Sequence, residues 1–208
     1  SLAGVEFSAA AWGDYDKDGD LDILLSGYDG SKSVARIYEN DKARFTQDTN
    51  AVLTGIHHGD ALWGDYNRDG YPDILLTGYH YSEEEQFSVT QIYRNTRGGF
   101  DDIQGELTPV SYASAAWGDY DGDGDSDILL TGTDPDTFKT AEIWRNNSGI
   151  FTRIDTDLPG VSSGAVAWKD YDKDGDDDIL LTGDDGLTKI ARVYRNHNGT
   201  FQDVNAGL

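Results

Sequence analysis

One sequence unit occurs four times in this chain, and this repetition limits the possible folds more than any other feature. The segment WGDYDKDGDLDILLSG, acidic and then apolar, occupies residues 12–27 and returns with few changes at residues 63–78, 117–132 and 168–183. A second block follows each copy and ends in a recurring asparagine: Asn40, Asn95, Asn146 and Asn196. The period is about 50 residues, so the 208 residues contain four units with almost nothing left over.

Each unit has the pattern of four short β-strands. The segment before the tryptophan is small and apolar, and DILLTG is a short apolar run between turn residues, typical of a strand buried on both faces. The block before the asparagine alternates, and the last segment is the most polar, as in an outer strand. We therefore predict an all-β fold, a β-propeller of four-stranded antiparallel blades. The expected blades are residues 2–52, 53–106, 107–157 and 158–208, within a single propeller domain or segment covering 1–208.

Composition excludes several classes of partner. The chain carries 16 basic and 39 acidic residues, a net charge of −23, which argues against nucleic acid or an anionic membrane surface as a partner. No apolar run is long enough to span a bilayer, so we expect no membrane insertion. The absence of cysteine excludes disulfides and thiolate ligands.

The acidic segments have the pattern of cation-binding loops. Aligned on their first aspartate they read DYDKDGDLD, DYNRDGYPD, DYDGDGDSD and DYDKDGDDD, with oxygen-bearing side chains at positions 1, 3, 5 and 9. Ca²⁺ takes six to eight oxygen ligands, and glycine at position 6 permits a sharp turn. Position 7 varies, as expected of a residue that contributes only its backbone carbonyl. An EF-hand would need a glutamate three residues after the last aspartate, where each copy has leucine.

This loop, followed by an apolar strand and repeated in every unit, resembles the FG-GAP/VCBS repeats of integrin-α-type β-propellers. The resemblance implies that each loop joins the first two strands of a blade and binds one Ca²⁺, about four per chain. The implied side-chain ligands are Asp14, Asp16, Asp18, Asp22, Asp65, Asn67, Asp69, Asp73, Asp119, Asp121, Asp123, Asp127, Asp170, Asp172, Asp174 and Asp178. The implied carbonyl ligands are Asp20, Tyr71, Asp125 and Asp176.

The resemblance also implies an extracellular or cell-surface platform for adhesion or ligand recognition. The W-G-D-Y entry and the lack of a clear F-G…G-A-P signature are closer to bacterial VCBS-type members than to animal integrins, so we expect a bacterial source. Four bound Ca²⁺ would change the net charge from −23 to −15.

The second loop is predicted to bind Ca²⁺ most weakly. Asn67 removes one negative charge, Arg68 adds a positive one, and Tyr71-Pro72 stiffens the loop. Because the number of charged ligands helps set the dissociation constant, this loop should have the lowest affinity.

Residues that break the repeat are the candidates for ligand binding, since the scaffold does not require them. Repeated tryptophans are expected to pack between blades, and the recurring arginines to pair with acids. The turns after DILLTG differ among units, and so do the connections between blades. The candidates are Tyr79, Tyr81, Phe138, His57, His58 and Tyr112, which could contact a protein or carbohydrate ligand or could simply belong to variable surface loops.

These patterns favour a binding or adhesion module without catalysis of its own. The chain contains no G-x-S-x-G, no phosphate-binding glycine loop and no H-E-x-x-H motif. The alternative is a polysaccharide-processing enzyme, or its accessory domain, with chemistry on the loop face, the face that carries the variable turns and the connections between blades. Because related propellers usually form rings of seven or eight blades, two chains could complete an eight-bladed ring as a homodimer, or the four units could belong to a longer tandem chain.

Overall fold

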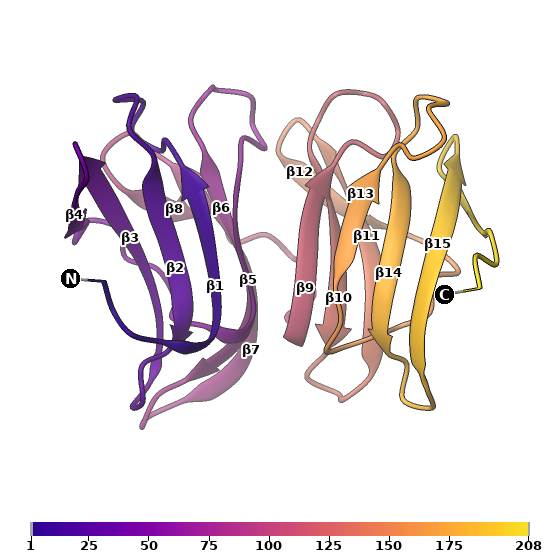
Figure 1. Cartoon of the computed structure of the whole chain (residues 1–208), viewed down its shortest axis with the longest axis horizontal. Helices are drawn as coiled ribbons and strands as arrows, with labels where there is room; N and C mark the ends of the chain where they lie inside the picture. Colours follow the sequence, from indigo (N-terminus) through magenta and orange to yellow (C-terminus); the bar gives the residue numbers. More distant parts are fainter. Residues whose placement is uncertain (1, 208) are drawn as a thin grey trace. The chain divides into compact units, whose positions relative to one another are not determined.

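The chain folds entirely into β-structure. The computed structural model describes residues 2–207, which form the sixteen strands β1 to β16 and no helix. They build four four-stranded antiparallel sheets, each with its strands in chain order, here called blades 1 to 4 (Figure 1). The prediction of an all-β fold with four-stranded antiparallel blades is confirmed. Within 2–207 there is no helix long and apolar enough to cross a membrane.

The first compact unit of the chain ends at Ser111 and contains blades 1 and 2. Blade 1 consists of β1 (Glu6–Gly13), β2 (Asp22–Tyr28), β3 (Ser33–Asp41) and β4 (Arg44–Gln47). Blade 2 consists of β5 (His57–Gly64), β6 (Asp73–Tyr81), β7 (Gln86–Asn95) and β8 (Phe100–Asp102). The two sheets share one core, in which Leu24 and Ile37 of blade 1 pack with Ile74 and Leu76 of blade 2, all fully buried.

The second compact unit begins at Tyr112 and contains blades 3 and 4. Blade 3 consists of β9 (Ser111–Gly118), β10 (Asp127–Thr133), β11 (Lys139–Asn147) and β12 (Ile150–Ile154). Blade 4 consists of β13 (Val166–Lys169), β14 (Asp178–Asp184), β15 (Lys189–His197) and β16 (Thr200–Asp203). Its core repeats the first: Leu129 and Ile143 pack with Ile179 and Leu181.

The burial of the strands follows the sequence pattern. In β6 and β10 the first six residues are all buried, as the apolar DILLTG run predicts. The short outer strands β4 and β16 have no buried residue, which agrees with their polar composition. The second strand of each blade is therefore the centre of the core, and the fourth is its rim.

One of the repeated tryptophans in each unit packs between neighbouring blades, as predicted. Trp63 of blade 2 lies against Gly13 of blade 1 and is stacked with Tyr15, with ring centroids 5.9 Å apart. In the second unit Trp168 lies against Gly118 in the same way. Trp12 departs from the prediction, because its side chain is 61% exposed.

Candidate functional site

The acidic loops connect the first and second strands of the blades. Within each compact unit these connections lie at one end of the strands, and the turns between second and third strands lie at the opposite end (Figure 1). The position-6 glycines all have positive φ, between 86° and 102°, as the sequence predicts: Gly19, Gly70, Gly124 and Gly175. A side chain there would strain the backbone, so this glycine lets the loop turn back into the second strand.

The last aspartate of each loop holds the loop closed. Asp22 is fully buried; one carboxylate oxygen accepts a hydrogen bond of 2.8 Å from the Asn40 backbone N–H and the other accepts one of 3.2 Å from the Tyr15 N–H. The same pair of bonds recurs at Asp73, Asp127 and Asp178. Each carboxylate oxygen keeps a second lone pair, so this residue can close the loop and still contribute to a cation site.

The first aspartates supply the clearest sign that a cation fits. One carboxylate oxygen of Asp14 and one of Asp119 are buried without any hydrogen-bond partner. A buried anionic oxygen is costly unless a positive charge or a donor satisfies it. A hard cation at the centre of the loop would satisfy it, and the surrounding donor set consists of oxygens, as Ca²⁺ requires.

Three of the four loops bring carboxylates together closely enough to hold a metal ion. Ligand oxygens lie within 4.8 Å of one another in three trios, which are Asp14, Asp16 and Asp18; Asp119, Asp121 and Asp127; and Asp170, Asp172 and Asp178. Within residues 2–207 the second loop has no such acidic trio. There, both carboxylate oxygens of Asp65 accept backbone N–H bonds, from Asp69 at 3.0 Å and from Gly70 at 2.9 Å.

Arginines form ion pairs with aspartates on the outer side of the third and fourth loops. Arg145 Nε lies 2.7 Å from Asp121 and its guanidinium reaches Asp123 at 3.0 Å, and Arg195 pairs in the same way with the corresponding aspartates of the fourth loop. Arg94 pairs instead with Asp101, at 3.4 Å. The recurring arginines therefore pair with acids, as predicted, and they neutralise part of the charge without filling the centre of the loop.

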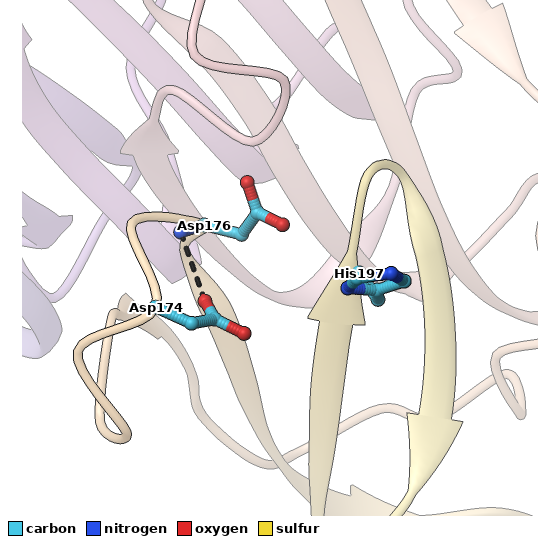
Figure 2. A group of neighbouring side chains, drawn as sticks. All are labelled: Asp174, Asp176 and His197. Carbon is cyan, nitrogen blue, oxygen red and sulfur yellow. Dashed lines mark hydrogen bonds between the residues drawn. The ribbon is translucent and has the colours of Figure 1, made fainter.

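A histidine extends the cluster of the fourth loop. Asp174, Asp176 and His197 bring one ligand atom each within 4.8 Å of one another (Figure 2). The two aspartates already have other partners, because Asp174 pairs with Arg195 at 2.8 Å and Asp176 accepts a bond of 2.9 Å from the Asn198 N–H. This group is therefore the outer rim of the fourth loop and not a separate site.

The recurring asparagines have a role that sequence reasoning missed. The Asn95 amide donates to the Tyr15 carbonyl in the preceding blade's loop at 2.8 Å and to the Pro72 carbonyl of its own loop at 3.1 Å. Asn196 donates in the same way to Tyr120 and to the loop of its own blade. The asparagine thus joins consecutive loops within a unit, and its regular recurrence was the signal that could have revealed this.

Burial raises the pKa of three of the aspartates that close the loops, which makes them weaker acids than usual. Burial raises the pKa of Asp22 to about 6 and the pKa of Asp73 and Asp127 to about 7, although backbone N–H bonds partly offset this effect. Near neutral pH, protons therefore compete with a cation for these oxygens.

The stability of the metal-free protein is expected to fall as the pH rises from about 4 to about 7. The folded chain binds protons at Asp73 and Asp127 that the unfolded chain, with an aspartate pKa of about 3.9, releases, so deprotonation costs folding free energy. Thermal unfolding in a chelator at several pH values measures this. A melting temperature that rises with pH in the chelator would contradict the assignment, and excess Ca²⁺ should flatten or reverse the trend.

The structure brings four of the six predicted ligand residues together in the first unit. His57 contacts His58 and Tyr79, with ring centroids 4.8 and 5.7 Å apart, and Tyr81 lies near them on β6. The other two, Tyr112 and Phe138, belong to the second unit, where their side chains are 50% and 69% exposed.

Sequence reasoning missed two further aromatic residues of this group, Phe7 and Tyr28, and the acidic Glu6 beside them. Glu6, Phe7 and Tyr28 of blade 1 line a hollow of about 220 Å³ together with His57 and Tyr81. Two signals could have identified the two aromatic residues. Phe7 occupies the repeat position of His58, and Tyr28 occupies the repeat position of Tyr79.

Comparison with known proteins agrees with this repeat structure. A model of the FG-GAP-like repeat matches residues 14–76, 65–130 and 119–181, so that each match begins at the first aspartate of a loop. The chain belongs to the FG-GAP-like repeat family. Each of these matches ends within the buried strand that follows the acidic loop of the next blade. The family's repeat therefore includes the acidic loop and the buried strand as one unit.

Two curated relatives carry the name T-cell immunomodulatory protein. The one from Rattus norvegicus is 28% identical over 202 residues, which cover 91% of this chain and 32% of the relative. The one from Mus musculus is 28% identical over 204 residues, with 92% and 32% covered. The chain thus spans about a third of the length of these relatives. Both come from mammals, so the expectation of a bacterial source is not supported.

Proposed function

We propose that this FG-GAP-like repeat chain is a calcium-stabilised binding module of the adhesion type, which recognises a protein or carbohydrate ligand and has no catalysis of its own. The observation that carries the proposal is that the repeated and the non-repeating residues occupy different places in the structure. The repeated residues build loops and cores, whereas the non-repeating aromatic residues of blades 1 and 2 gather around one hollow. A repeat scaffold presenting a unique surface is the usual arrangement of a recognition module.

Four Ca²⁺ ions, one per loop, are the proposed cofactors. The side chains at positions 1, 3, 5 and 9 and the carbonyl at position 7 would hold each ion. The buried unpartnered oxygens of Asp14 and Asp119 support this assignment. The ion would supply positive charge to a self-repelling group of carboxylates and tie the first strand of a blade to the second.

The second loop is expected to fill last in a calcium titration, and Asn67→Asp is expected to tighten it. The substitution restores the carboxylate that the other three loops have at position 3. Isothermal titration of the wild-type protein, of Asn67→Asp and of the exposed control Asn205→Asp measures the effect. Four equal sites in the wild-type protein, or equal gains in both variants, would contradict it.

A glycan array followed by turnover assays tests the binding function against the alternative of a polysaccharide-processing enzyme. Binding of a glycan without product formation supports the module. Released product that depends on the loop face would favour the enzyme.

The proposed location is outside the cell or at its surface. Extracellular calcium modules work with dissociation constants of about 10⁻⁴ to 10⁻³ M, which suits four partly exposed loops of this kind. Either a homodimer completing an eight-bladed ring or further repeats in a longer parent chain would be the structural partner. Secretion of a tagged full-length protein from its native cell is the measurement that tests the location.

A further inference from the structure

An arc of four aromatic rings surrounds the hollow in the first unit. Phe7 of β1, His57 of β5, Tyr28 of β2 and Tyr81 of β6 follow one another, with neighbouring ring centroids 6.4, 5.7 and 5.9 Å apart. Together with Glu6 they line the space of about 220 Å³. Because the rings come from two blades, the hollow forms only when blades 1 and 2 pack together.

A buried serine contacts two residues of the arc. The Ser33 hydroxyl lies 2.8 Å from His57 Nδ1 and accepts a hydrogen bond of 2.9 Å from the Tyr81 backbone N–H. Ser33 is only 4% exposed. The hydroxyl thus orients the His57 ring and holds the Tyr81 backbone beside it, and this order before a ligand arrives lowers the entropic cost of binding.

The backbone at the edge of the arc is strained. Phe7 has a φ of 50° and His58 a φ of 53°, in the left-handed region that bulky residues rarely adopt. Their rings lie 4.2 Å apart, and the pairing of β1 with β2 shifts register between Glu6 and Ala9. The equivalent residues of blades 3 and 4, Tyr112 and Ser163, have φ values of 49° and 53°, so this conformation belongs to the repeat, and in blades 1 and 2 it places the Phe7 and His58 rings at the edge of the arc.

The charge around the hollow is negative. Burial, and next the neighbouring His58, lower the pKa of His57 below its ordinary value, so His57 is neutral at pH 7. Glu6 then carries the only charge among the lining residues. The whole chain has a net charge of −23, so its field attracts cations.

We propose that this hollow is a binding site for a small alkylated ammonium ion, such as a trimethylammonium group. Aromatic faces attract a cation through their quadrupoles, and a carboxylate at the rim adds a direct charge interaction. This inference rests on the binding function proposed above, because it names the chemical group that the same hollow would recognise.

The chemistry of the lining distinguishes this ligand from other cations. One carboxylate cannot supply the six or more oxygens that Ca²⁺ prefers. A primary ammonium is strongly hydrated and needs several acceptors in exchange for its water. An alkylated ammonium has fewer hydrogen bonds to lose and presents methyl groups to the rings, which suits a hollow lined mainly by aromatic side chains.

Choline chloride and its uncharged isostere 3,3-dimethylbutan-1-ol form the decisive pair of probes. Calcium-saturated protein is titrated with each and followed by NMR. We expect saturable, millimolar binding of choline and at least about fivefold weaker binding of the isostere. Equal binding of both, binding of neither, or preference for glucose over choline would overturn the proposal. If choline binds, sedimentation with phosphatidylcholine vesicles would assign the group to a lipid headgroup, and no sedimentation to a free solute.

Three variants locate the site. Glu6→Gln and Tyr81→Leu are each expected to weaken choline binding by about fivefold or more, because each removes charge or a ring face from the hollow. Phe87→Leu removes an exposed aromatic ring of blade 2 that does not line the hollow, and it should leave binding unchanged. Thermal unfolding verifies that each variant is folded. Equal effects of all three variants, or of none, would contradict the assignment.

Discussion

Replacing Asn196 by alanine is expected to destabilise the protein far more than the same replacement at Asn40. Asn196 is fully buried, and its amide donates to the Tyr120 carbonyl at 2.7 Å and to the Asp177 carbonyl at 3.0 Å. Alanine would leave both carbonyls without this donor inside the protein. The expected cost is about 3 kcal/mol, or a fall of about 6–12 °C in melting temperature.

Asn40 is the matched control, because it occupies the same repeat position and only one loop carbonyl accepts its amide. It donates to the Leu21 carbonyl at 3.0 Å and is partly exposed. Asn40→Ala should therefore cost about 1 kcal/mol. Thermal unfolding of both variants decides the matter, and equal losses of stability would show that joining two loops is not the asparagine's role.

Lys169→Gly is expected to strengthen association between copies of the chain. In both units a glycine lies under the tryptophan of the next blade: a Cβ atom on Gly13 would lie 2.7 Å from Trp63 Cδ1, and one on Gly118 would lie 2.4 Å from Trp168 Cδ1. Blade 4 has Lys169 at this position. A tryptophan could not pack there in the repeated geometry, because the lysine side chain would occupy its place.

The surface beside Lys169 is otherwise suited to receive another blade. Leu180 is 43% exposed, whereas Leu24 and Leu129, at the same repeat position, are fully buried. Leu180 also lines an almost wholly apolar hollow of about 440 Å³ next to Lys169. Trp12 of blade 1, 61% exposed, is the complementary residue that a second copy would present.

Gel filtration with light scattering measures the effect. We expect Lys169→Gly to lower the dissociation constant of self-association by about tenfold or more, since it removes a steric block and a charge from an apolar contact. Lys173→Gly, which removes the same charge from an exposed loop, is the control. Addition of Trp12→Ala to Lys169→Gly should reverse the gain. An unchanged mass at all concentrations would show that the faces of blades 1 and 4 do not meet.

The sequence predicted the parts of this molecule that repeat. Four copies of one pattern identify the strands, the glycine turns of the loops and the buried DILLTG strands, because a short-range pattern repeated at one period reports local structure directly. The closing role of Asp22 and the loop-joining role of Asn95 were missed. Both depend on bonds between segments far apart in the chain, at which the sequence pattern only hints.

The aromatic hollow could be predicted only in part. His57 and Tyr81 stood out because they break the repeat, but Phe7 lies in a bulge of β1 and Tyr28 at the end of β2, and they meet the other rings only when the blades pack. The exposure of Trp12 was also missed. Its repeat position predicts packing between blades, but whether a partner blade covers it is a property of the assembled structure.

Thermal unfolding with and without calcium is the most direct test of the central claim, that cations in the loops stabilise the folded chain. A cation bound only by the folded state contributes about 2.7 kcal/mol per site at a hundredfold excess over its dissociation constant, so several sites together should raise the melting temperature by more than about 10 °C. We predict that chelation removes this gain and that added Ca²⁺ restores it. A melting temperature that is the same in chelator and in excess Ca²⁺ would contradict the account.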